Sequence, residues 1–413
     1  MNTNSLKQDS PPRQFFLDWL RILAFALLVP YHVGMYYVSW DWHIKSPHAT
    51  AALEPLMQLL SPWRLSLLFF IAGAVLQIAL RQRADAGGLA FLGRRTRRLL
   101  WPLLFGMLVV VPPQAYFEVV EQLHYAGSYV DFMRLYLRAY SGFCDADGCL
   151  TLPTWNHLWF LPYLLVYTVL AWGLMRVAPQ LLDRAAASLG RASAVVLLLG
   201  LALPLMFSRL TLLEFETTHN LVWDWYNHAQ SLSAFMLGLL LARSGGVWAR
   251  LADLRWVALL LALTAWGVRM GYFSFFAQPE PALLLVGALR LLYGAMQWWA
   301  IAAACGFAYR HLNVDSPLRR ALSPAIFCVY ILHQTVIIVL ARALAPLQLA
   351  PLGEGLLLIA LTLLVCGLAY LLLRRLPLLR GAFGITAERS QADGLSRPPA
   401  EGVRQARGGT SIS

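Results

Sequence analysis

The chain has 413 residues, of which 59% are apolar and only 13% are charged, and its mean hydropathy is +0.59. This composition excludes a soluble enzyme and is typical of a protein that crosses a membrane several times. The formal net charge of +12 does not predict a nucleic-acid partner, because the sequence contains no basic and aromatic module of the kind that grips phosphates in solution.

Apolar segments long enough to cross a bilayer recur along the whole chain, and they predict an all-α polytopic membrane protein with about ten transmembrane helices. The predicted spans are 16–38, 61–80, 99–118, 155–175, 193–212, 226–242, 256–276, 283–307, 321–342 and 353–373. Most of the 33 Lys and Arg residues fall on one side of this arrangement, which predicts that both termini are cytoplasmic. We expect a membrane domain at 15–380 between polar tails at 1–14 and 381–413, the latter disordered.

The first apolar run contains three ionisable residues, and groups buried at that depth need a functional or a pairing reason. Asp18, Arg21 and His32 are spaced so that one continuous helix would present them on the same face. Arg21 and His32 would then be about 16 Å apart, one near a membrane surface and the other near the bilayer centre. The polar residues also argue for a retained helix rather than a cleaved signal peptide.

Four arginines follow within five residues, in the connection between the second and third predicted spans. They are Arg94, Arg95, Arg97 and Arg98. Guanidinium groups bind phosphate through paired hydrogen bonds, so this cluster could bind a polyanion at the cytoplasmic face. The same composition also fits a simple positive-inside anchor or a contact with anionic lipid.

Aromatic and polar residues alternate at the predicted outer ends of the spans. The three stretches are 40–43 (WDWH), 155–157 (WNH) and 223–228 (WDWYNH). Flat rings beside carboxylates and amides could bind the faces and hydroxyl edges of sugars. An ordinary interfacial belt of Trp and Tyr has the same composition, so both interpretations stay open.

Cysteine usage suggests one structural feature and no metal site. Cys144 and Cys149 fall in the outer connection 119–153, where we also expect a short surface helix, and they are close enough to staple a turn on an oxidising side. Two free thiols are the alternative. Cys305, Cys328 and Cys366 lie in predicted spans, where they would pack as small apolar residues.

Five motifs together resemble the membrane acyltransferase family 3. The first helix carries Asp-x-x-Arg with a His eleven residues after the Arg, and the other stretches follow in the family's order: 68–73 (LFFIAG), 95–102 (RTRRLLWP), 157–161 (HLWFL) and 330–333 (YILH). The tract from Asp18 to Asp41 is most similar to the glucans biosynthesis protein C branch, whose members modify periplasmic glucans with succinyl groups. Ala72 stands where the family usually has Ser, so no hydroxyl role is carried over there.

The resemblance implies an O-acyltransferase of the bacterial inner membrane. It would move a succinyl or acetyl group from cytoplasmic acyl-CoA to a hydroxyl group of an extracytoplasmic glycan, with no permanently bound cofactor. His32 would be the general base, Arg21 would bind the donor or steady the thioester oxyanion, and Asp18 would orient Arg21.

Several further roles follow from the same resemblance. The four arginines at 94–98 would bind the phosphates of coenzyme A. Trp159, His157, Tyr330 and His333 would line or support the site. A covalent acyl-His intermediate and direct transfer are both compatible with these residues. The alternative function is a transporter or flippase for a glycan or a lipid-linked precursor, since polar residues in spans also mark transport paths.

Overall fold

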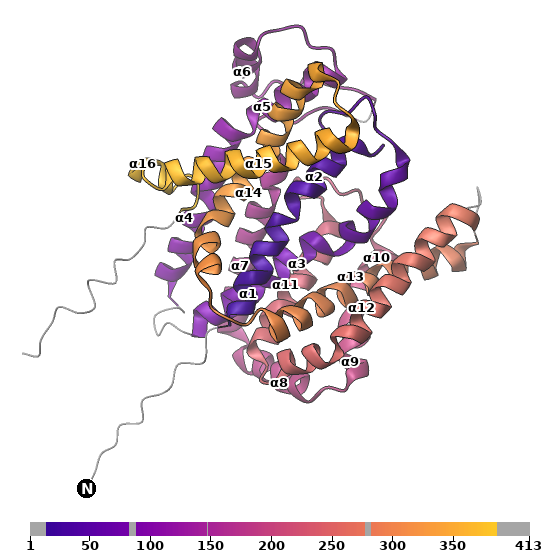
Figure 1. Cartoon of the computed structure of the whole chain (residues 1–413). Coiled ribbons are helices and arrows are strands. Elements are labelled where there is room, and N and C mark those ends of the chain that lie inside the picture. Colours follow the sequence, from indigo (N-terminus) through magenta and orange to yellow (C-terminus); the bar gives the residue numbers. More distant parts are fainter. Residues whose placement is uncertain (1–13, 82–87, 147, 277–281, 386–413) are drawn as a thin grey trace, which may run out of the picture.

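The computed structural model describes residues 14–81, 88–146, 148–276 and 282–385, and within these ranges every regular element is helical (Figure 1). The predicted N-terminal tail, except Gln14, and the C-terminal tail beyond residue 385 lie outside the described residues. Residues 381–385 belong to the folded body, because Ala382, Phe383 and Ile385 are buried and Phe383 packs on Phe105.

The first half of the chain forms eight helices. They are α1 (Phe15–Ala26), α2 (Leu28–Tyr37), α3 (Glu54–Arg81), α4 (Leu89–Phe105), α5 (Pro112–Gln122), α6 (Tyr129–Leu137), α7 (Phe160–Val177) and α8 (Pro179–Arg191). The second half consists of α9 (Ala194–Leu198), α10 (Leu203–Thr211), α11 (Trp225–Arg243), α12 (Val247–Gly271), α13 (Leu283–His311), α14 (Pro317–Leu344), α15 (Pro351–Leu373) and α16 (Pro377–Arg380). Short 3₁₀ or π segments, η1 to η6, join several of them. The N-terminal span packs against α3 and against α13, α14 and α15 of the second half.

All ten predicted spans are largely helical, but their ability to cross a membrane differs. Eight helices in the described ranges are long and apolar enough to do so, and the bent pair Leu89–Val110 and Pro112–Gln122 brings the number to nine. The pair bends by 43°, because Pro112 and Pro113 cannot donate backbone hydrogen bonds to the preceding turn. The predicted span 226–242 corresponds to α11, whose first turns carry Asn227 and Gln230 and are too polar to count.

The first span, Phe15–Tyr37, is interrupted at a single residue. Helix α1 ends at Ala26, Leu27 is a turn residue, and α2 begins at Leu28. Pro30 explains the break, because it lacks the N–H that would bond to the carbonyl of Ala26. Arg21 and His32 therefore lie on two successive helical segments, so the argument from one uninterrupted helix face holds only approximately.

Two glycines let α3 and α11 cross closely. A Cβ added to Gly73 would collide with the carbonyl of Phe235, and one added to Gly238 would collide with the carbonyl of Phe70. Small residues that face each other in this way let helix backbones approach in membranes. The crossing anchors α3, whose N-terminal half contributes to the functional site.

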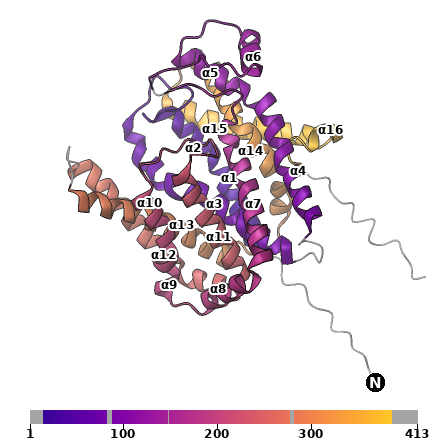
Figure 2. The same ribbon diagram turned by 180° about the vertical axis from the view of Figure 1, so that it is seen from behind.

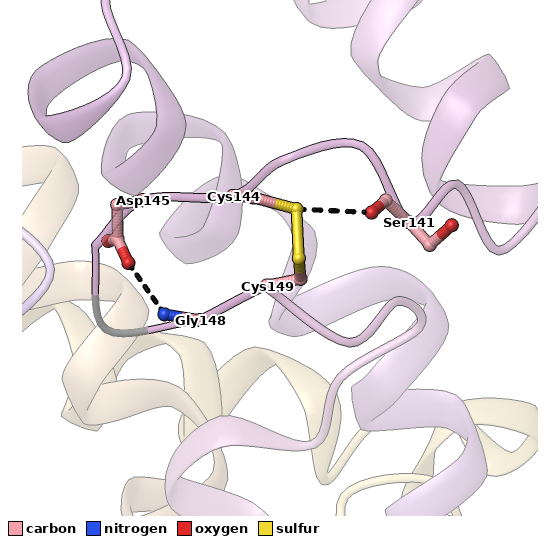
Figure 3. Close-up of a disulfide and its surroundings, with 5 residues drawn as sticks. All are labelled: Ser141, Cys144, Asp145, Gly148 and Cys149. Atoms are coloured by element: carbon pink, nitrogen blue, oxygen red, sulfur yellow. Dashed lines mark hydrogen bonds between the residues drawn. A yellow bond between two sulfur atoms is a disulfide. The ribbon is translucent and has the colours of Figure 1, made fainter.

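The long predicted connection 119–153 lies at the end of the molecule opposite α8 and α9, above the bundle together with α5 and α6 (Figures 1 and 2). The predicted surface helix is present as α6. Cys144 and Cys149 form a disulfide, and Asp145 accepts a hydrogen bond from the Gly148 amide at 3.0 Å within the same loop (Figure 3). The three remaining cysteines are buried, as predicted.

Candidate active site

His32 lines a polar cavity with a volume of about 430 Å³. The cavity brings together five residues predicted from the sequence, namely His32, His157, Trp159, Tyr330 and His333. Helices α2, α3 and α14 and the segment that leads into α7 form its walls. The predicted site residues of this half of the membrane therefore converge, although they span 301 positions of sequence.

The protonation of His32 is defined by its hydrogen bonds. Nδ1 of His333 lies 2.7 Å from the carbonyl oxygen of Tyr330, and Nε2 of His333 lies 3.1 Å from Nδ1 of His32. A carbonyl only accepts, so neutral His333 carries its proton on Nδ1 and offers the lone pair of Nε2. His32 must then donate from Nδ1, which leaves the lone pair on its own Nε2. This is the tautomer that a general base requires.

His157 and Tyr330 stiffen the wall behind this pair. Nε2 of His157 lies 3.0 Å from the carbonyl of Ile331, and the hydroxyl of Tyr330 donates to the carbonyl of His157 at 2.9 Å. Nδ1 of His157 in turn accepts from the Gln114 amide at 3.1 Å. These bonds join α14 to the start of α7, so His157 and Tyr330 support the cavity rather than project a free polar atom.

A histidine–carboxylate pair, His43 with Glu118, lies in the same cavity and was not predicted. Nδ1 of His43 is 2.6 Å from a carboxylate oxygen of Glu118, and its Nε2 is 2.8 Å from the amide nitrogen of Gln334. In the sequence, His43 stands out only as part of an aromatic stretch, and Glu118 lies 75 residues away on α5. His43 and Glu118 both line the cavity, so their contact is part of its wall.

Arg64 contributes a buried positive charge to the cavity. Its side chain is 6% exposed, and its guanidinium carbon lies 3.2 Å from the ring centroid of Tyr31. Nε and Nη1 have no hydrogen-bond partner among the described residues. Donors that are desolvated and unsatisfied in this way favour an acceptor on a bound molecule.

The aromatic stretches contribute unequally. Residues 41–43 and 155–157 line the cavity, and the Trp159 ring contacts the His219 ring at a tilt of 33°, with ring centroids 4.3 Å apart. Burial lowers the pKa of His219. In the third stretch, Asp224 is fully buried and accepts from the hydroxyl of Tyr163 at 2.5 Å, whereas Trp223 is 67% exposed. Asp224 therefore holds the loop together and is not part of the cavity wall.

Arg21 belongs to two smaller cavities on the opposite side of the site, of about 210 and 160 Å³. Arg98 lines both of them, and Arg95 lines the smaller one. Arg94 and Arg97 are exposed and face away from both. The helix α4 explains this division, because residues three apart share a face and their immediate neighbours do not.

Asp18 has two cationic neighbours. It lies 3.4 Å from Arg21, as the spacing predicted, and 2.5 Å from Arg319 of α14. Arg319 is almost fully buried and also binds Asp315 at 2.7 Å. Asp18 thus ties the first helix to α14 in addition to orienting Arg21, and Arg21 also donates to Ser323.

The cavity lined by His32 and the smaller cavity lined by Arg21 and Arg95 abut. Leu68 of α3 and Phe160 of α7 line both the 430 Å³ cavity and the 160 Å³ cavity. An apolar layer of two side chains therefore separates His32 from the space next to Arg21 and Arg95. Within the described ranges, no group of three or more His, Cys, Asp or Glu side chains is arranged to hold a metal ion.

The motifs and the paired cavities agree with a comparison against known families. A family model described as an acyltransferase domain matches residues 14–371. The chain belongs to this acyltransferase family. The match includes every residue named above as lining the three cavities.

Individual relatives are distant. The chain is 24% identical over 201 residues to glucans biosynthesis protein C of Salmonella gallinarum, which is 46% of this chain and 48% of the relative. It is 25% identical over 175 residues to glucans biosynthesis protein C of Escherichia coli K12, or 41% of each chain. The chain thus matches about half the length of these relatives or less, and no solved structure matches it.

Proposed function

We propose that this protein is an integral membrane O-acyltransferase that moves an acyl group from acyl-CoA to a hydroxyl group of a glycan on the opposite side of the membrane. One observation carries the proposal. A basic cavity with Arg21 and a histidine cavity with His32 meet at Leu68 and Phe160. This arrangement suits a reaction whose two substrates approach from opposite sides and whose acyl group is the only part that crosses.

On the inner side, Arg95, Arg98 and Arg21 would bind the phosphates of coenzyme A, since planar guanidinium groups match phosphate geometry. Exposed Arg94 and Arg97 would contribute long-range attraction or contact anionic lipid headgroups. The pantetheine arm would then point along α1 toward the apolar layer. Coenzyme A enters here as a substrate, and succinyl-CoA and acetyl-CoA are the two donors we consider.

On the outer side, Nε2 of His32 would take the proton of the acceptor hydroxyl as its oxygen attacks the thioester carbonyl. The carbon–sulfur bond then breaks, and the departing thiolate takes the proton back from the imidazolium. The guanidinium of Arg64 would stabilise the negative charge that develops on the carbonyl oxygen, or a carboxylate on the acyl chain. If acyl-His forms first, Nε2 of His32 attacks the thioester carbonyl and the thiolate leaves an acyl-imidazolium. The acceptor hydroxyl then attacks the acyl group, the carbon–nitrogen bond breaks, and the hydroxyl proton neutralises the thiolate.

The acceptor would bind between the aromatic and polar side chains of the outer cavity. Trp42, Trp155 and Trp159 offer flat faces, and Asp41 and Asn156 offer hydrogen-bonding edges. That combination fits the apolar faces and hydroxyl rims of a sugar. The printed name of the relatives, glucans biosynthesis protein C, is consistent with a glucan as acceptor.

Replacing His32 by Ala tests the proposal. In a deletion strain that produces the variant, mass spectrometry of periplasmic and surface glycans should detect loss of an acyl ester, with a rate reduction of about 10²- to 10⁴-fold. His48, which is exposed and outside the cavities, provides the matched control as His48→Ala. Unchanged acylation by the His32 variant, at equal amounts of protein in the membrane, would contradict the mechanism.

A further inference from the structure

Two arginines away from the cavities share one aromatic ring. The guanidinium carbon of Arg209 in α10 lies 4.0 Å from the ring centroid of Tyr293 in α13, and that of Arg269 in α12 lies 4.6 Å from the same centroid. Arg209 also donates to the hydroxyl of Tyr226 at 2.7 Å. Four helices, α10 to α13, therefore bring two positive charges to one place.

Among the described residues, no carboxylate forms an ion pair with either arginine. Arg269 is 7% exposed, and its Nε and Nη1 atoms have no hydrogen-bond partner among the described residues. The Nε atom of Arg209 is also buried without a partner. Buried guanidinium groups with unsatisfied donors require acceptor oxygens, which an anionic ligand would supply.

The surroundings identify the kind of anion. Both arginines lie in the last turn of their helices, next to side chains that expose apolar surface: Phe207 is 67% exposed and Phe273 is 51% exposed. Trp225, at the start of α11, is 51% exposed. Apolar exposure on spans faces acyl chains, and interfacial Trp marks the level of the headgroups. An anion that arrives at this level with apolar chains attached is a membrane lipid.

The side of the membrane follows from α11. This helix begins beside the arginine pair and ends at Arg243, whose carbonyl accepts a hydrogen bond from Arg81 at the end of α3. Arg81 leads toward the basic helix α4. The pair therefore lies at the end of the bundle opposite Arg94 to Arg98, in the leaflet on the side of the outer cavity.

We propose that Arg209, Arg269 and Tyr293 form a binding site for the phosphate group of an anionic membrane lipid. The two guanidinium groups grip the phosphate oxygens, and the Tyr293 ring holds both cations in place when the site is filled. The lipid joins α10, α12 and α13. Binding of the lipid would also stabilise the contact of α13 with α3, because Gln297, one turn after Tyr293, donates a hydrogen bond to Ser66 of α3. The site is independent of the proposed acyl transfer.

The test uses the full-length protein purified in detergent and three additions: phosphatidylglycerol, phosphatidylcholine and inorganic phosphate. Native mass spectrometry counts retained lipid, and thermal unfolding measures the shift in Tm. We expect phosphatidylglycerol to bind and raise Tm. Phosphatidylcholine carries the same phosphate but places a quaternary ammonium group beside it, which the two arginines repel, so it should bind about tenfold more weakly. Inorganic phosphate should have no effect at the same concentration.

Variants localise the effect. Arg209→Gln and Arg269→Gln should each weaken phosphatidylglycerol binding about tenfold or more. The matched control is Arg255→Gln, in the same helix as Arg269 and also next to a ring, that of Phe307. Should the glutamine variants fold poorly, Arg269→Lys keeps the charge without the planar fork and should show a smaller loss. Equal binding by wild type and the Arg269 variants, an equal loss in the Arg255 control, or saturation by inorganic phosphate would overturn the proposal.

Discussion

His333→Phe separates the role of His333 from that of His32. The change removes the Nε2 acceptor that lies 3.1 Å from Nδ1 of His32. The His32 ring then keeps its place in the cavity but loses the bond that selects its tautomer. His333→Gln is the matched variant, because a side-chain carbonyl oxygen can accept the same hydrogen from His32.

The size of the effect follows from the cost of that one bond. A buried donor left without its partner costs about 1 to 3 kcal/mol. If this cost falls on the competent tautomer, kcat decreases roughly 5- to 150-fold. Removing the base itself by His32→Ala should cost more, about 10²- to 10⁴-fold. The Gln variant should stay within roughly fivefold of wild type.

Release of coenzyme A thiol from acyl-CoA by protein in nanodiscs, with a crude glycan fraction as acceptor, measures both kcat and KM. A positioning role predicts that KM for acyl-CoA is unchanged while kcat falls. It also predicts that the Gln variant regains most of the loss. A wild-type rate for His333→Phe would refute the assignment of the tautomer, and a Gln variant as slow as the Phe variant would refute the positioning role.

Three further outcomes are expected. Asp315→Asn should lower Tm at pH 6. The hydrogen bond from Arg319 lowers the pKa of Asp315 below its usual value of 3.8, so the carboxylate stabilises the fold above pH 3.8 and loses that contribution as the pH falls through the lowered pKa. The difference in Tm between wild type and variant should vanish there, and a difference that persists in acid contradicts this. Arg95→Gln should raise KM for acyl-CoA about tenfold, and Arg94→Gln should raise it much less. The same thiol assay measures both, and equal effects would refute the assignment of Arg95 to the cavity and of Arg94 to the exposed face of α4. Leu68→Trp should fill the layer between the cavities and abolish glycan acylation while acyl-CoA still binds in equilibrium dialysis; full acylation would exclude a path past Leu68.

Sequence alone predicted the features that depend on neighbouring residues. Hydropathy marked the spans, and the i, i+3 spacing predicted the contact of Asp18 with Arg21. The division of the arginine cluster also follows from helix geometry, although it could be stated only once α4 was seen to bury Arg95. The predicted span that became α11 is less apolar than the others. Its first turns are polar and are buried among other helices, and hydropathy along the chain does not show such burial.

The rest of the site depends on tertiary packing. The partner of His32 is 301 residues away, as is the second cation next to Asp18. Glu118 could not be assigned to His43, because a single carboxylate on an outer helix has no distinguishing sequence pattern. Arg64 was visible as an arginine within a span, but only its burial and its unsatisfied donors show that it faces the cavity.

The apolar layer of Leu68 and Phe160 has an electrical consequence. Under the proposed function the two cavities open toward opposite sides of the membrane, and each then takes the potential of the compartment it faces, so the membrane voltage falls mainly across this thin layer. One elementary charge moved through 100 mV corresponds to about 2.3 kcal/mol. An acetyl group crosses the layer without charge, so its transfer is insensitive to voltage. A succinyl group carries its free carboxylate through the drop, and the rate of its transfer should change with the membrane potential.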